Sequence, residues 1–264
     1  MMNYKLGADP EMFMADRMGQ LKAACGRIGG TKQHPMPMGI GDGFFVQEDN
    51  VAIEFNIPPS DTKEAFSTNL SRAVHELSNG VDQMYQFQII NLSAASFPAE
   101  ELTSPAAQEF GCDPDYNAWT GRKNPRPKAT DANLRSCGGH VHIGLEYPMR
   151  HSPTRIIKAM DLFLGVPSVL MDKGELRKEL YGKAGAFRAK IYGVEYRTLS
   201  NFWVFNAPLH DWVWDNVGRA LDAVESQLVD FDHEQESILD AIDNNNKERA
   251  NELVNKYGLE VVYV

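Results

Sequence analysis

The chain contains four short segments in which two polar or charged residues flank one apolar residue. These pairs are Asp9 with Glu11, Glu54 with Asn56, His140 with His142, and Glu195 with Arg197. Residues i and i+2 of a β-strand point to the same side of the sheet. Each segment is therefore predicted to be a strand that buries its apolar residues and presents acids, imidazoles or a guanidinium on its other face.

Hydrophobic spacing and helix-start signals predict the remaining elements. Apolar residues recur at steps of three and four over residues 62–88, which predicts an amphipathic helix with Ser60 or Asp61 as its N-cap. Ser152 and Pro153 predict the start of a second helix, and the tail over 212–257 is predicted to be helical. Strands are expected at residues 4–7, 44–48, 51–57, 88–94, 140–145 and 191–199. This irregular order predicts an α+β fold with a largely antiparallel sheet.

The 264 residues contain no internal repeat, low-complexity tract or linker-like segment. We therefore expect one domain over residues 1–264, with residues 205–264 as a C-terminal helical region. The apolar positions expected to be buried in that region are Leu221, Val224, Leu228, Ile238, Leu239, Ile242 and Leu253.

The chain is acidic, with 26 Lys and Arg against 36 Asp and Glu and a net charge of −10. This balance argues against broad nucleic-acid binding and against an anionic membrane surface as a partner. The three cysteines form no CxxC pair, so neither a zinc knuckle nor a disulfide framework is expected. The sequence shows neither a signal-peptide core nor a run of 18 apolar residues, and a cytoplasmic protein is expected.

Carboxylates combined with imidazole form a hard donor set that suits Mg²⁺ or Mn²⁺ better than zinc. Such an acidic face would repel a phosphate unless metals and arginines offset the charge. Arg197 and the segment 181–188, which contains Lys183 and Arg188, could provide that offset. Ala184 follows Gly182-Lys183, so this segment is no P-loop. The residues indicate an enzyme that acts on a metal–nucleotide complex.

Four motifs stand in a recognisable order. They are Gly-Ala-Asp-Pro-Glu-Met-Phe at 7–13, Glu-Asp-Asn-Val-Ala-Ile-Glu-Phe-Asn at 48–56, Cys-Gly-Gly-His-Val-His-Ile-Gly at 137–144 and Tyr-Gly-Val-Glu-Tyr-Arg-Thr-Leu-Ser-Asn at 192–201. Together they resemble the phage-type carboxylate–amine ligases, amidoligases of the glutamine synthetase and glutamate–cysteine ligase superfamily. The resemblance spans residues 7 to about 203.

The resemblance implies a curved, mainly antiparallel sheet that forms a funnel, with helices on its outer face. It also implies that ATP and two or three Mg²⁺ ions, or Mn²⁺ as a substitute, bind on the concave face. The residues it places at the metals are Asp9, Glu11, Glu54, Glu195 and His140, with Glu48 as a neighbour. The residues it places at the phosphates are His140, His142, Arg188 and Arg197, with Lys183 nearby.

The implied reaction is ATP-dependent and forms an amide bond. A substrate carboxylate attacks the γ-phosphate to give an acyl phosphate and ADP, and an amine then displaces phosphate. The expected partners are a small carboxylate and an amine, which could be a modified nucleobase. The resemblance is also compatible with a homo-oligomer. If the chain is phage-encoded, the compartment is the host cytoplasm. Two alternatives stay open: a metal-dependent hydrolase, and a nucleotide-binding protein of the same fold without turnover.

Overall fold

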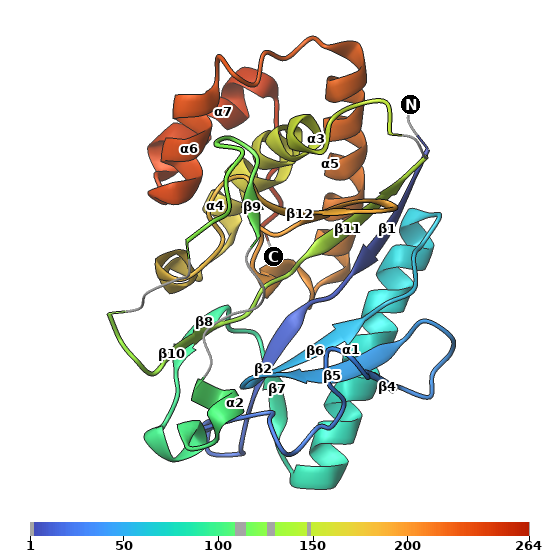
Figure 1. The fold of residues 1–264 in the computed structure, drawn as a ribbon, viewed down its shortest axis with the longest axis vertical. Helices are drawn as coiled ribbons and strands as arrows, with labels where there is room; N and C mark the ends of the chain where they lie inside the picture. Colours follow the sequence, from blue (N-terminus) through green and yellow to red (C-terminus); the bar gives the residue numbers. More distant parts are fainter. Residues whose placement is uncertain (1–2, 109–114, 126–129, 147–148, 264) are drawn as a thin grey trace.

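The computed structural model describes residues 3–108, 115–125, 130–146 and 149–263 (Figure 1). Cys25 and Cys137 are free thiols, and Cys112 lies outside the described residues. Every helix in the described part of the chain is too short or too polar to span a lipid bilayer.

The strands of the described residues form two larger sheets and one small one, and neighbouring strands within each sheet pair antiparallel. The first sheet has the order β1 (Tyr4–Ala8), β11 (Val141–Leu145), β13 (Gly193–Tyr196), β12 (Ala186–Lys190) and β9 (Tyr116–Asn117). The second has the order β3 (Leu21–Lys22), β2 (Glu11–Ala15), β6 (Ala52–Asn56), β5 (Phe45–Asp49) and β4 (Met36–Pro37), and β7 (Gln88–Ile90) also pairs with β2. The small sheet pairs β8 (Ala94–Ser96) with β10 (Leu134–Ser136).

The two larger sheets join where β1 runs into β2 through Asp9 and Pro10. On one edge of this joint, the amide of Asp9 donates to the His140 carbonyl at 3.4 Å. On the other edge, the amide of Phe55 donates to the Pro10 carbonyl at 3.2 Å. Proline has no amide hydrogen, so the chain can bend at Pro10 without losing a ladder hydrogen bond. The sheets therefore form one curled, mainly antiparallel surface, which confirms the predicted fold class.

The helices follow the expected order with shifted boundaries. They are α1 (Lys63–Tyr85), α2 (Pro105–Gln108), α3 (Pro153–Met160), a π-helical turn (Asp161–Gly165), α4 (Val166–Met171), α5 (Ala207–Ser226), α6 (Gln235–Asp243) and α7 (Lys247–Tyr257), with 3-10 turns at Ala99–Leu102, Glu175–Glu179 and Asn201–Trp203. The expected N-cap of α1 was wrong, because the Thr62 side chain accepts from the Ala65 amide. Ser152 caps α3 as predicted.

The helices pack on the apolar side of the curled sheet. Val141, Ile143, Val194 and Tyr196 of β11 and β13 are buried in the same core as the helices, and α3 contacts β12 and β13. The alternate side chains of these strands face the other, concave side. Figure 1 shows α1 behind β5 and β6, and α5 running beside α3.

The C-terminal helices α5, α6 and α7 contribute to that shared core. Of the predicted apolar positions, Leu221, Val224, Ile238, Ile242 and Leu253 are buried and Leu239 is half-buried. Leu228 is 87% exposed, which corrects the prediction. The cause is that α5 ends at Ser226, and Gln227 adopts a left-handed conformation that turns the chain away from the core.

A fully buried carboxylate, Asp161, ties several loops to the back of β13. Its oxygens accept hydrogen bonds from Trp119 Nε1 and the Gly185 amide, both at 2.6 Å, and from the hydroxyls of Tyr196 at 2.8 Å and Thr198 at 3.2 Å. Burial outweighs these hydrogen bonds and raises the pKa of Asp161 to about 7. Tyr196 and Thr198 flank Arg197, so Asp161 supports the strand end that presents this arginine.

The raised pKa of Asp161 predicts a pH-dependent stability. The folded protein holds this proton up to about pH 7, whereas the unfolded chain releases it near pH 4. The contribution of Asp161 to the free energy of unfolding therefore falls as pH rises between these values. In urea unfolding, the free energy of unfolding of the wild type should fall by at least about 1 kcal/mol relative to that of Asp161→Asn between pH 4.5 and 7.5. A difference that stays constant with pH would contradict this.

Candidate functional site

Strand register brings the first group of predicted residues together on the concave face. His142 of β11 lies opposite Glu195 of β13, and Glu195 lies opposite Arg188 of β12. Asp9, at the joint between the sheets, reaches the same place. One ligand atom from each of Asp9, His142 and Glu195 lies within 4.8 Å of the others. We call these three residues the first cluster.

Asp9 is held by two imidazoles. Its Oδ1 lies 3.0 Å from His142 Nε2 and 3.4 Å from His140 Nδ1. Burial by itself raises the pKa of Asp9, but the charges and hydrogen bonds of His142 and His140 outweigh it and hold that pKa well below the ordinary range. Burial lowers the pKa of His142, but the Asp9 carboxylate outweighs this effect, so that the pKa of His142 is raised. The Tyr192 hydroxyl contacts Nδ1 of His142 and fixes the ring orientation.

Glu195 is fully buried and surrounded by cations. It forms ion pairs with Arg197, with Lys190 at 2.7 Å and with Arg188 at 3.6 Å. Burial and the Asp9 charge raise its pKa, but Arg197 and the two histidines outweigh them and lower it to about 2. Arg197 in turn lies 3.3 Å from Asp115, so its guanidinium is oriented by two acids.

A second cluster of three buried carboxylates lies on the adjoining sheet. Glu11 of β2 lies opposite Glu54 of β6, and Asp49 comes from β5. One oxygen from each lies within 4.8 Å of the others. Burial, and then the charges of Asp9, Asp49 and Glu11, raise the pKa of Glu54 well above its ordinary value. Lys32 offsets part of this negative charge, with its Nζ 2.9 Å from Asp49 Oδ1.

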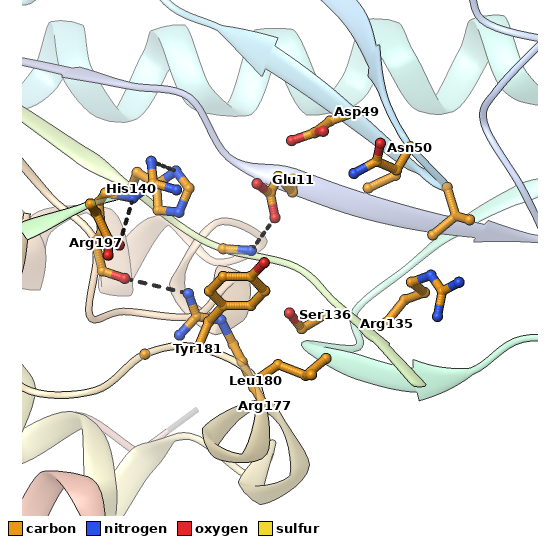
Figure 2. Close-up of a pocket in the computed structure, with 15 residues that line it drawn as sticks. Glu11, Asp49, Asn50, Arg135, Ser136, His140, Arg177, Leu180, Tyr181 and Arg197 are labelled. Atoms are coloured by element: carbon orange, nitrogen blue, oxygen red, sulfur yellow. Dashed lines mark hydrogen bonds and ion pairs between the residues drawn. The ribbon is translucent and has the colours of Figure 1, made fainter. Parts of the chain in front are cut away.

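Both clusters border a cavity of about 510 Å³. It is lined by Asp9, Glu11, Lys32, Gln47, Glu54, His140, Arg188 and Arg197. A second cavity of about 620 Å³ shares Glu11, His140 and Arg197 with it. Figure 2 shows the second cavity extending from these three residues past Tyr181 and Arg177 towards Arg135. The first cavity, which we call the acidic cavity, therefore adjoins the second, and the walls of both carry arginines as well as carboxylates.

Most of the residues predicted from sequence line these cavities or, like His142 and Glu195, contact residues that do. The structure brings together Asp9, Glu11, Glu54, His140, His142, Arg188, Glu195 and Arg197. It does not bring Lys183 there, because that side chain is exposed and its Nζ donates to the Asp243 carbonyl at 2.8 Å.

Sequence reasoning missed Asp49, Lys32, Lys190 and Asp115. Asp49 is identified by the strand register, which the structure supplies. Glu54 pairs with Gln47 across β5 and β6, and the two-residue period then places residue 49, and not residue 48, on the face of Glu54. No comparable signal existed for Lys32, which comes from a loop.

Glu48, predicted as a neighbour of the metals, has a different role on the opposite face of β5. Its carboxylate accepts hydrogen bonds from the amides of Gly26, Arg27, Ile28 and Gly29 at 2.7–3.1 Å. These bonds fix the glycine-rich loop against the strand.

Removing this anchor should destabilise the protein. Glu48→Ala leaves four amide donors without their acceptor, and we expect the free energy of unfolding to fall by about 2–3 kcal/mol. Glu48→Gln keeps one acceptor oxygen and should lose roughly half as much. Urea unfolding of the two variants measures both. Equal stability of wild type and Glu48→Ala would show that water replaces the anchor.

The donor set fits hard divalent cations. Five carboxylates and two imidazoles converge, and the carboxylate-rich part suits Mg²⁺ or Mn²⁺. Burial, and then the neighbouring charges of Asp9, Asp49 and Glu11, raise the pKa of Glu54, which shows that a negative charge on Glu54 is disfavoured in the second cluster. A divalent cation bound there would favour the charged form of Glu54.

Comparison with known proteins matches one segment of the chain to a ligase family. Residues 129–215 match the model of a family described as phage phiEco32-like COOH-NH2 ligase-type 2, which confirms the resemblance carried by the motifs at 137–144 and 192–201. Asp9, Glu11, Asp49 and Glu54 lie outside the matched segment. No curated protein matches the chain.

A solved structure with a similar course of the chain is a bifunctional glutathione synthetase from Pasteurella multocida. The TM-score is 0.44 at 14% sequence identity, and the match covers 97% of this chain and 49% of that one. The chain thus spans about half the length of this structural neighbour.

Proposed function

We propose that this chain is an ATP-dependent carboxylate–amine ligase that works through an acyl phosphate on Mg–ATP and releases ADP. The observation that carries the proposal is the meeting of two acidic clusters with Arg188 and Arg197 at one cavity. The family match over residues 129–215 supports the ligase class.

The two clusters would hold the divalent ions. Asp9, His142 and Glu195 form one ligand set, and Glu11, Asp49 and Glu54 form the other. His140 stands beside Asp9 and lines the same cavity. A divalent ion bound there neutralises negative charge on the phosphoryl oxygens of the nucleotide. Arg188 and Arg197, which line the same cavity, would bind those oxygens and stabilise the charge that moves during transfer.

The adjoining cavity would hold the acid substrate. It meets the acidic cavity at Glu11, His140 and Arg197, so a carboxylate placed at this boundary would face the γ-phosphate. A carboxylate oxygen attacks the γ-phosphorus, the bond to the ADP oxygen breaks, and an acyl phosphate forms. An uncharged amine then attacks the carbonyl carbon, phosphate leaves, and the amine nitrogen loses a proton to give the amide.

The experiment separates this function from its alternatives. The protein is incubated with Mg–ATP, hydroxylamine as a small amine, and a panel of carboxylic acids, and ADP and hydroxamates are measured by a coupled assay and by mass spectrometry. We expect acid-dependent ADP release and a hydroxamate of the same acid. Amide or ester cleavage without ATP would favour the metal-dependent hydrolase. Tight nucleotide binding without ADP release for any acid would favour a protein that has lost turnover.

Lys183→Met is the matched control for that assay. Lys183 lies two residues from the cavity residue Tyr181 in sequence, yet its ammonium points to the Asp243 carbonyl. Activity should be retained in this variant.

A further inference from the structure

Lys32 lines the acidic cavity and belongs to a loop whose backbone is held against β5. Glu48 binds four amides of the segment 26–29, and Gly30 follows with φ +74°. A Cβ on Gly30 would lie 2.6 Å from the Val46 carbonyl oxygen, so only glycine allows the loop to press this closely on β5. The loop backbone next to Lys32 is therefore anchored, and its long side chain is the part that can move.

The side chain of Lys32 is partly exposed, and its ammonium contacts a buried carboxylate. It is 39% exposed, whereas the Asp49 side chain that its ammonium contacts is 6% exposed. Lys32 also lowers the pKa of Glu54, so its charge acts on more than one carboxylate of the second cluster. It lines the same cavity as Arg188 and Arg197.

Two cations cannot share the second cluster easily. A divalent ion held by Glu11, Asp49 and Glu54 would bind the carboxylate of Asp49 that Lys32 also contacts, and the two positive charges would repel each other at this short distance. Lysine has a flexible four-carbon stem and a compact charge, so its ammonium can move several ångströms without moving the backbone.

We propose that Lys32 is an exchangeable counter-ion of the second cluster: its ammonium holds Asp49 while the cluster lacks a divalent cation and binds a nucleotide phosphate once the cluster is filled. The nucleotide half of this inference rests on the proposed function, and the metal half does not. In this proposal Lys32 contacts the nucleotide substrate, and the loop that carries it is part of the active site.

The metal half is tested by Mn²⁺ titration without nucleotide, with free Mn²⁺ followed by electron paramagnetic resonance. Lys32→Met removes the competing charge, and we expect the apparent Kd for Mn²⁺ to fall by at least about tenfold. Lys32→Arg keeps the charge and should stay near wild type. Lys63→Met removes an ion pair of the same 2.9 Å length to Asp215 on the surface and should change nothing. Unchanged or weaker Mn²⁺ binding in Lys32→Met would overturn the competition.

The nucleotide half is tested by calorimetric titration with a non-hydrolysable ATP analogue and Mg²⁺. We expect Lys32→Met to bind this complex at least about tenfold more weakly than wild type, although its Mn²⁺ affinity is higher. Equal nucleotide affinity would overturn the phosphate contact. If wild type bound no nucleotide, the proposed function and the phosphate contact would both fail, and the Mn²⁺ titration would still decide the metal half.

Discussion

Glu54→Gln is expected to abolish ADP formation and at the same time to stabilise the metal-free protein. Glu54 is buried beside Glu11 and Asp49, and burial and these neighbours raise its pKa well above the ordinary value. A carboxyl with a raised pKa reduces the free energy of unfolding at every pH above its unfolded value. Glutamine keeps the shape and removes that cost, so the gain at pH 7.5 should be at least about 1 kcal/mol.

The same substitution removes a proposed metal ligand. We expect the acid-dependent ADP release to fall by at least about a hundredfold, in the range seen when one group that stabilises a transition state is lost. Mn²⁺ titration should lose one binding site. The stability gain should shrink as pH falls towards 4, where the unfolded carboxyl also becomes protonated. Destabilisation together with near-wild-type activity would remove Glu54 from the site.

The opposite signs of stability and activity at Glu54 are typical of a functional site. An apolar or amide side chain would pack better there, and the sequence instead holds three buried carboxylates within reach of one another. This is also why sequence reasoning could find Glu54. It stands between Ile53 and Phe55 on a strand whose other residues suit a core, and the two-residue period makes it stand out.

The two-residue period of polar and apolar residues predicted the strands, but it did not predict every residue that lies beside them in the sheet. It placed Glu11, His142 and Glu195 on one face because each belongs to a continuous alternating segment. It could not choose between Glu48 and Asp49 without knowing that β5 pairs with β6 in a register where Gln47 meets Glu54. Register depends on the turn at Asn50 and on both hydrophobic faces together, which is tertiary information.

Loop residues were beyond the reach of the sequence. Lys183 and Lys32 are both lysines near glycines, and only the folded chain shows that the first donates to Asp243 while the second reaches Asp49. Asp161 stands in a helical run of apolar residues and would be read as a polar position on the surface. It is fully buried because four donors from distant segments converge on it.

Glu195→Gln provides the contrast to Glu54, because both activity and stability are expected to fall. The Glu195 side chain is fully buried, and three cations, Arg197, Arg188 and Lys190, form ion pairs with it. Its pKa is lowered from 4.5 to about 2, so its charge stabilises the folded protein above pH 4.5 and this contribution is lost as pH falls towards 2. The shift corresponds to about 3 kcal/mol, and glutamine should forfeit it at pH 7.

The two glutamine variants can be compared in one pair of measurements. Urea unfolding at pH 7 should order them as Glu54→Gln, then wild type, then Glu195→Gln, from most to least stable, while ADP release should be at least about a hundredfold lower in both than in wild type. The loss of stability in Glu195→Gln should lessen as pH falls from 4.5 towards 3, because the Glu195 carboxylate of the unfolded wild-type chain takes up its proton in this range while that of the folded protein stays ionised. If both variants lost stability equally, the clusters would share one electrostatic environment. The division into a cation-rich first cluster and a carboxylate-rich second cluster would then be wrong.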